Sequence, residues 1–316
     1  MDCHDRGRGC LFGLAIGDAL GAAVEFMPPG SFAPVDGYRG GGPHRLEPGQ
    51  WTDDTSMALA LAESIAEVGW NLDDQAKRYI RWWQDGYLSV NDQCFDIGMT
   101  TRESLWRYLK SGEAYRSGDN SEHACGNGSI MRLAPVPIRY AEYFPDRLEE
   151  LVGLAEQSSL PTHAHEACLS ACRYLATLIA ALIRGDDREE VLKPDWQGLR
   201  RLENIKPLHP TISSIARGSF RHKRPPEIRG TGWVVKSLEA ALWAFHEAND
   251  FEQAVLRAVN LGDDADTTGA VTGQLAGAYW GESGIPTPLK VGLARAEWID
   301  RMACRLLEVK PEAVSG

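Results

Sequence analysis

The chain has 316 residues, of which 43% are hydrophobic and 24% charged, a composition typical of globular proteins and unlike that of disordered ones. Its formal net charge of −11 argues against a nucleic-acid-binding surface as the main function. The seven cysteines include no CxxC pair, and we find neither a signal-peptide pattern nor a run of 18 or more apolar residues. We therefore expect a protein with reduced thiols, no membrane span and a cytoplasmic location.

The first predicted helix covers residues 7–27 and carries glycine at every fourth position from Gly13 to Gly21. Each glycine costs about 1 kcal/mol in a helix interior, so the repeat predicts that another backbone packs closely against this helix. Two acids lie on this otherwise apolar segment. We expect Asp18 to be a buried carboxylate that holds nearby backbone, and Glu25, at the helix end, to face a cavity.

A loop rich in glycine and proline, residues 28–50, leads to a short acidic motif at the start of an apolar helix. In this motif Thr52 and Thr55 flank the adjacent Asp53 and Asp54. One polar residue is enough to cap a helix, so two adjacent aspartates between threonines exceed what capping requires.

The next predicted helix is capped by Asn71, and a glycine-containing loop at 86–98 follows it. Within that loop Asp96 stands between apolar neighbours, where we expect it to cap a helix at 99–111. Residues 111–124 are polar, which predicts a surface loop.

A glycine-rich segment, Gly126–Arg132, is predicted to open another helix. Glycines on both sides of Asn127 leave backbone N–H groups free for an anion, to which Ser129 and Arg132 would add. Turns use the same residues, so the segment alone does not decide between a turn and an anion site.

Further helices are predicted at about 145–158, 164–184, 234–249, 250–261, 268–280 and 286–309. His163 lies between the first two of these helices, and residues 186–230 read as irregular chain. For the basic tract at 217–224 we favour a solvated loop. Because no strand pattern, repeat or linker appears, we predict one all-α domain over residues 1–316, with a core at about 7–309.

A second acidic segment, Gly262–Gly269, places three aspartates and two threonines within six residues. On its own it fits either an acid-capped helix N-terminus or a metal site. Together with the first acidic motif it offers enough oxygen ligands, without Cys or His, for two hard divalent cations that share a bridging carboxylate. We favour this metal interpretation, with the ligands Thr52, Asp53, Asp54, Asp264, Asp266 and Thr267.

The chain carries several motifs in the order seen in ADP-ribosylglycohydrolases: Gly17–Gly21, Trp51–Thr55, Gly126–Arg132, Thr162–His163 and Gly262–Gly269. Over residues 7–309 it resembles that family, and within it the bacterial dinitrogenase-reductase-activating glycohydrolase type. The resemblance implies a single compact, all-α, multi-helix orthogonal domain with a dinuclear Mg²⁺ or Mn²⁺ cleft. It also implies an enzyme that removes ADP-ribose from a modified protein side chain, which is arginine in the activating type. We expect the protein to be a monomer.

The resemblance assigns a role to individual residues. The six oxygen ligands above would hold the metals, and Glu25 and Asp96 would be the catalytic acids. The glycine-rich segment would cradle the phosphates, His163 would contact ribose or phosphate, and Trp233 would stack on adenine. The substrate-binding residues are then Gly126, Asn127, Gly128, Ser129, Met131, His163 and Trp233. Asp263 falls where relatives carry glycine, so we expect it to point away from the metals.

In the mechanism that the resemblance implies, two metals bind the hydroxyls of the distal ribose and lower the pKa of a bridging water. Glu25 or Asp96 then acts as base or acid, and the sequence does not decide between these two carboxylates.

Four residues depart from the pattern of relatives and leave the acceptor of the ADP-ribose open: Met99, Ala124, Cys125 and Trp233. Serine, a nucleobase or a small molecule are the alternatives to arginine. A non-catalytic ADP-ribose-binding relative and a metal-dependent phosphohydrolase are the alternatives from other functional classes.

Overall fold

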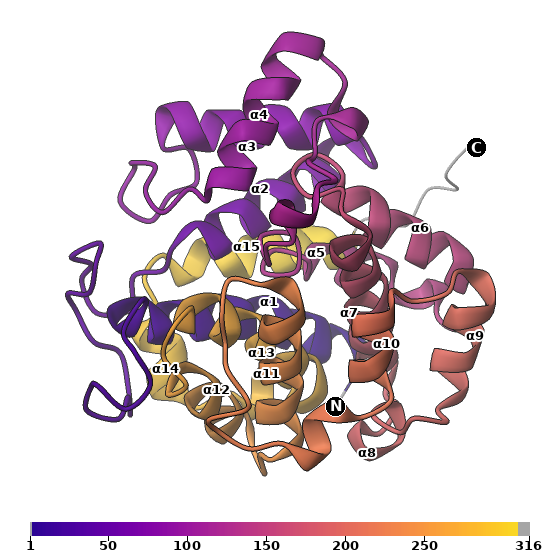
Figure 1. The fold of residues 1–316 in the computed structure, drawn as a ribbon. Helices are drawn as coiled ribbons and strands as arrows, with labels where there is room; N and C mark the ends of the chain where they lie inside the picture. Colours follow the sequence, from indigo (N-terminus) through magenta and orange to yellow (C-terminus); the bar gives the residue numbers. More distant parts are fainter. Residues whose placement is uncertain (1, 309–316) are drawn as a thin grey trace.

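Two antiparallel helices, α1 (Cys3–Gly21) and α13 (Ala265–Trp280), lie at the centre of the computed structural model, which describes residues 2–308 (Figure 1). Glycines of one helix face glycines of the other, as in the pairs Gly13–Gly273 and Gly17–Gly269. A Cβ atom at any of these four positions would overlap the carbonyl of its partner, so only glycine permits this close approach. The predicted contact of the glycine repeat with another backbone is confirmed.

This antiparallel contact brings the end of α1 to the beginning of α13. After α1, the short 3-10 helix Ala22–Val24 leads to Phe26, whose N–H donates to the carbonyl of Asp263 at 2.6 Å. In return, the N–H of Asp263 donates to the carbonyl of Met27 at 2.8 Å. Two segments more than two hundred residues apart in sequence therefore form one wall of the molecule.

The other helices surround this central pair, and their buried side chains form one hydrophobic cluster. In Figure 1, α2, α3 and α4 make up the upper part, and α7, α9 and α10 lie on the right. The helices are α2 (Asp53–Val68), α3 (Leu72–Asp85), α4 (Met99–Ser111), α5 (Pro135–Tyr140), α6 (Leu148–Ser159), α7 (Glu166–Arg184), α8 (Arg188–Val191), α9 (Gln197–Ile205), α10 (Pro210–Ala216), α11 (Val234–His246), α12 (Phe251–Val259), α14 (Thr287–Gly292) and α15 (Ala296–Glu308). Residues 2–308 contain isolated β-bridges but no strand, so the predicted all-α class is confirmed.

Three predictions about helices were wrong. The segment 186–230, expected to be irregular, contains α8, α9 and α10. These helices are at most nine residues long and are separated by prolines, so the helical period is too short to be recognised. The helix predicted at 286–309 is two helices, because the chain between α14 and α15 is extended at Leu293 and left-handed at Arg295. Residue 309 lies outside the described residues. The third error, at Gly126–Arg132, concerns the active site and is described below.

Two helical segments, Cys3–Val24 and Glu166–Arg184, have the length and composition of membrane spans. In the structure 89% and 94% of their most apolar stretches are buried inside the protein. Their apolar character therefore serves the packing of the protein core.

Candidate active site

A buried carboxylate, Asp18 on α1, holds the start of α2. One of its oxygen atoms accepts hydrogen bonds from the N–H and hydroxyl of Thr52, at 2.8 and 2.9 Å. The other accepts from the N–H and hydroxyl of Thr55, at 3.0 and 2.6 Å. Burial raises the pKa of Asp18 to about 6 although these four hydrogen bonds oppose the shift. The structure thus confirms Asp18 as the buried residue that fixes neighbouring backbone.

The two acidic motifs meet at this point. Carboxylate oxygens of Asp53, Asp54 and Asp266, here named the acidic cluster, lie within 4.8 Å of one another. Threonines link the two motifs: the hydroxyl of Thr52 lies 3.2 Å from Asp266, and that of Thr267 lies 3.2 Å from Asp54. The close packing of α1 on α13 is what brings these distant residues together.

The acidic cluster is buried and electrostatically strained. Its three carboxylates are 1–8% exposed, and no Lys or Arg within residues 2–308 pairs with any of them. Burial first, and then the surrounding carboxylates, raise the pKa of all three well above the usual value. In the described structure, Oδ2 of Asp54 and Oδ1 of Asp266 are buried acceptors without any hydrogen-bond partner. Buried oxygen atoms of this kind are suited to hold divalent metal ions.

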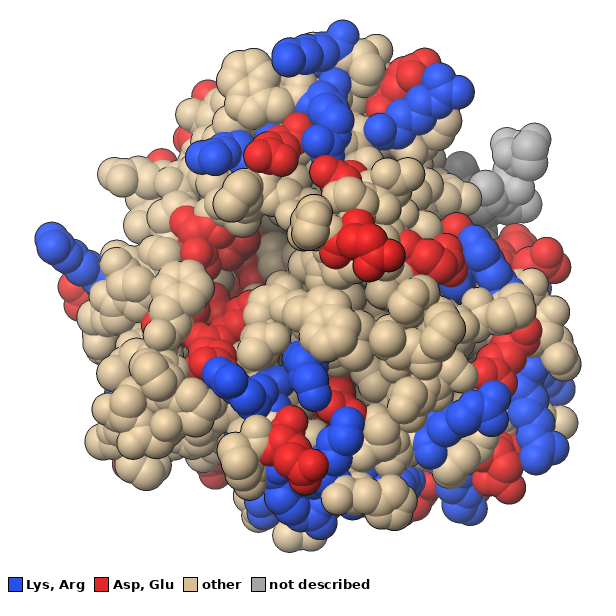
Figure 2. Space-filling view, viewed as in Figure 1, with Lys and Arg blue, Asp and Glu red and all other residues tan. Residues whose placement is uncertain are grey.

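A cavity of about 250 Å³ lies in front of the acidic cluster. Figure 2 shows acidic side chains gathered around a hollow in this face of the molecule. The predicted site residues among its lining residues are Glu25, Asp53, Asp96, Gly126, Asn127, Gly128, Met131, His163, Asp264 and Thr267. The other predicted metal ligands, Thr52, Asp54 and Asp266, are buried behind this lining.

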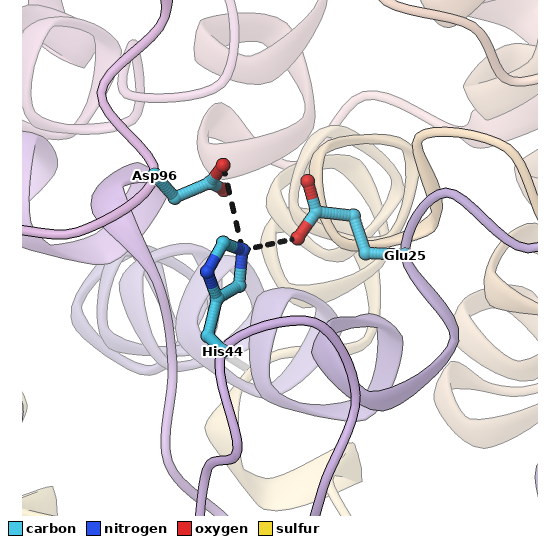
Figure 3. A group of neighbouring side chains, drawn as sticks. All are labelled: Glu25, His44 and Asp96. Atoms are coloured by element: carbon cyan, nitrogen blue, oxygen red, sulfur yellow. Dashed lines mark hydrogen bonds and ion pairs between the residues drawn. The ribbon is translucent and has the colours of Figure 1, made fainter.

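Glu25 and Asp96 lie on two different loops and meet across a histidine (Figure 3). Nε2 of His44 lies 2.9 Å from Oε2 of Glu25 and 3.4 Å from Oδ1 of Asp96. These hydrogen bonds raise the pKa of His44 to about 10, whereas burial, partly opposed by His44, raises the pKa of Glu25 to about 8. The expected capping role of Asp96 is wrong, because the N-cap residue of α4 is Gly98 and no side chain caps the helix there.

The glycine-rich segment forms a turn instead of a helix start, and the next helix, α5, begins only at Pro135. The N–H of Asn127 donates to the carbonyl of Gly232, and its side-chain amide donates to Asp264 at 2.9 Å. These two bonds hold the turn against the chain just before α11 and against the N-cap residue of α13. Within the described residues the backbone N–H groups of Gly128 and Ser129 have no acceptor, and of these two residues Gly128 lines the cavity.

Two residues of this segment do not act as expected. Arg132 is only 1% exposed and donates to the carbonyl of Gly128 and to the hydroxyl of Thr162, both at 2.7 Å. It therefore supports the turn from inside the protein and is not free to bind an anion. The side chain of Ser129 is also buried and is not among the described residues that line the cavity.

His163 faces the cavity as a neutral ring. Burial lowers its pKa to about 3, and its Nδ1 lies 2.8 Å from the hydroxyl of Thr162. Among the described residues Nδ1 of His163 is the one acceptor found for the hydroxyl proton of Thr162, whose oxygen accepts from Arg132, and we infer that this proton points to Nδ1. The ring then carries its proton on Nε2, which lies next to Gly126 and Gly128.

Trp233 lies beside the cavity and is 44% exposed. It is the N-cap residue of α11 and forms a backbone bridge with Gly126. Asp263 accepts two hydrogen bonds from Arg229, at 2.9 and 2.7 Å, and is outside the cavity lining among the described residues.

A family model described as ADP-ribosylglycohydrolase matches residues 1–314. The chain belongs to the ADP-ribosylglycohydrolase family. It is 40% identical to the ADP-ribosylarginine hydrolase Tri1 of Serratia proteamaculans, over 98% of this chain and 80% of that protein. It is 34% identical to the ADP-ribosyl-[dinitrogen reductase] glycohydrolase of Rhodospirillum rubrum, over 90% of this chain and 88% of that protein. A solved structure described as an ADP-ribosylglycohydrolase-related protein complex is 42% identical and superposes with a TM-score of 0.84, over 97% of this chain and 98% of that chain.

These findings confirm that the chain is a glycohydrolase with the fold of this family. In this ADP-ribosylglycohydrolase several residues at the cavity were not predicted from the motifs: Phe26, Gly98, Thr100, Thr101 and Gly232. The same holds for His44, which contacts Glu25 and Asp96. Its loop has no periodicity, and a single histidine among glycines and prolines carries little information. The one available signal was its position eight residues before Thr52, in the loop that leads into the acidic motif.

Proposed function

We propose that this ADP-ribosylglycohydrolase removes ADP-ribose from ADP-ribosyl-arginine on a protein by hydrolysing the N-glycosidic bond. The observation that carries the proposal is the convergence of the two acidic motifs, with two buried carboxylate oxygens that lack any partner among the described residues. The likeness to the ADP-ribosylarginine hydrolase of Serratia supports the acceptor, and the likeness to the glycohydrolase of Rhodospirillum supports the reaction.

We further propose that two divalent cations, Mg²⁺ or Mn²⁺, complete the site. The residues that would hold them are Thr52, Asp53, Asp54, Asp264, Asp266 and Thr267. Bound cations of this class supply Lewis acidity toward ribose hydroxyls and lower the pKa of a bound water. The oxygen-only ligand set fits hard cations and not zinc or copper.

The remaining steps belong to side chains around the cavity. Glu25 and Asp96 line the cavity, where either carboxyl group can take a proton from the water that attacks the anomeric carbon or give one to the leaving guanidine nitrogen. His163 donates from Nε2 to a ribose or phosphate oxygen, and the free N–H groups of Gly128 and Ser129 bind the phosphates. Trp233, exposed beside the cavity, offers a face on which adenine can stack.

The proposal also includes a single domain over residues 1–316 that acts as a monomer in the cytoplasm. Support for the location comes from the seven cysteines, all of which are free thiols within the described residues. Size-exclusion chromatography with light scattering tests the monomer, since a mass near twice 34.8 kDa would contradict it.

The test of the function is to incubate the protein with ADP-ribosyl-arginine and ADP-ribosyl-serine peptides, with Mg²⁺ or with EDTA. We expect free ADP-ribose from the arginine peptide only, and none in EDTA. Release from the serine peptide alone would assign a different acceptor. No release from either peptide, with ADP-ribose still bound, would identify a non-catalytic binder, and release of inorganic phosphate would identify a phosphohydrolase.

A further inference from the structure

His44 lies on a loop whose conformation is fixed by the protein. Gly41 and Leu46 pair as an isolated bridge, with N–H to carbonyl distances of 2.7 and 2.9 Å in the two directions. This pairing closes a small turn that carries His44 at its far end. The imidazole packs against Phe95 at 5.2 Å and Phe26 at 6.4 Å between ring centroids, so two aromatic rings limit its movement.

The imidazole stands between two carboxyl groups that repel each other when both are ionised. The contacting oxygen atoms of Glu25 and Asp96 and the Nε2 atom of His44 all lie within 4.8 Å of one another. Glu25 is only 4% exposed, so water screens this repulsion poorly. Among residues 2–308 no Lys or Arg pairs with either carboxylate, which leaves His44 as their shared donor.

A left-handed backbone conformation occurs at Asp96 and directly after Glu25, whose own φ is −54°. Asp96 itself has a φ of 59°, and Phe26, directly after Glu25, has a φ of 62°. Residues other than glycine adopt this left-handed region at an energetic cost, and such positions gather at functional sites. The chain at both carboxylates therefore has a defined conformation, in which His44 contacts both of them.

We propose that His44 is a positioning residue, which holds Glu25 and Asp96 together at the cavity wall. Its contact engages Oε2 of Glu25 and leaves Oε1, which has no hydrogen-bond partner among the described residues, for the reacting groups (Figure 3). This inference rests on the proposed function, because it takes Glu25 and Asp96 as the acid–base pair of the glycohydrolase. It assigns no contact with substrate to His44 itself.

The activity test compares His44→Phe, which keeps an aromatic ring but removes the donor, with His44→Gln, whose amide donates near the place of Nε2. The matched control is His4→Gln, because His4 is exposed at the opposite end of α1. We expect kcat on ADP-ribosyl-arginine peptide to fall roughly 100-fold in His44→Phe with KM within about threefold of wild type. We expect His44→Gln to recover at least a tenth of the wild-type kcat, and His4→Gln to match wild type.

Equal losses of kcat in both His44 variants would overturn the proposal, since they would show that the donor is not what matters. An unchanged kcat in His44→Phe would overturn it as well. A fall in folded protein or in Mn²⁺ stoichiometry in His44→Phe would assign the residue a structural or metal-binding role instead.

A second measurement does not depend on activity. In ¹⁵N spectra of the imidazole groups, the His44 signals are those that are missing in His44→Gln. At pH 7.5 we expect both ring nitrogens of His44 to be protonated in the wild type, with and without Mg²⁺, and the ring to be neutral in the double variant Glu25→Gln, Asp96→Asn. A neutral ring in the wild type, or loss of the Nε2 proton on addition of Mg²⁺, would overturn the proposal. Should the wild type release no ADP-ribose, the proposed function fails, whereas these spectra still decide the contacts of His44.

Discussion

Replacing Asp18 by asparagine tests how the protein builds its metal site. Asp18 is fully buried and accepts four hydrogen bonds, two from Thr52 and two from Thr55. Asparagine keeps one carbonyl oxygen, which can still accept from Thr52. Its NH₂ group then faces the N–H and hydroxyl of Thr55, both of which are donors in the native protein.

The expected loss follows from these contacts. The hydroxyl of Thr55 can rotate to accept from the new NH₂ group, but its backbone N–H loses its acceptor, and a buried donor without a partner costs about 1–3 kcal/mol. The two hydrogen bonds kept by Thr52 also weaken, since they no longer involve a charge. We therefore expect the free energy of unfolding in saturating Mg²⁺ to fall by about 2–4 kcal/mol. The affinity for Mn²⁺ should fall with it, because Thr52 and Asp54 lie in the segment that Asp18 holds.

Urea denaturation and Mn²⁺ titration measure the two effects. The control is Asp195→Asn, which makes the same change of charge at an exposed position. The reasoning would be refuted if Asp18→Asn had the same urea midpoint of unfolding as the wild type and the same affinity for Mn²⁺.

Three more outcomes are expected. Gly17→Ala should lower the free energy of unfolding by about 3 kcal/mol or more, because the new Cβ atom would overlap the backbone of α13. Gly37→Ala should cause no such loss, because no atom lies within 4 Å of a Cβ at that position, and equal urea midpoints for the two variants would contradict this reasoning. Thr162→Val should lower kcat/KM about tenfold and Thr162→Ser should not, because only a hydroxyl can fix the proton of His163 on Nε2. A similar fall of kcat/KM in both variants would count against that tautomer of His163. In EDTA, the free energy of unfolding should decline as pH rises from 6.5 to 8, because the raised carboxyl pKa values in the acidic cluster and at Glu25 make the folded state bind more protons than the unfolded state. The expected slope is about 1.4 kcal/mol per pH unit for each such proton. A melting temperature that is constant or rises with pH would contradict this expectation.

The sequence carried enough information to predict the centre of the site. The acidic motifs were recognisable because several charged residues in a row exceed what helix capping needs, and the glycine repeat because its spacing matches the helical period. Both features are local patterns. The two acidic motifs meet in space because α1 packs against α13. The glycines of α1 predicted this close contact, but they did not identify the partner helix.

What could not be predicted depends on tertiary contacts. Asp96 looked like a helix cap because the sequence does not show that a histidine from a distant loop lies beside it. Arg132 looked available to an anion, yet it is enclosed by Thr162 and the carbonyl of Gly128. For such residues the type of side chain is compatible with several roles, and only the neighbours select one.

The central claim is that ADP-ribosyl-arginine hydrolysis depends on cations held by the two acidic motifs. The most direct measurement is the rate of ADP-ribose release from an ADP-ribosyl-arginine peptide while Mn²⁺ is titrated into metal-free protein. We predict no release without metal and a rate that reaches its plateau at two equivalents of Mn²⁺. Release at the full rate in EDTA, or no release at any Mn²⁺ concentration, would contradict the account.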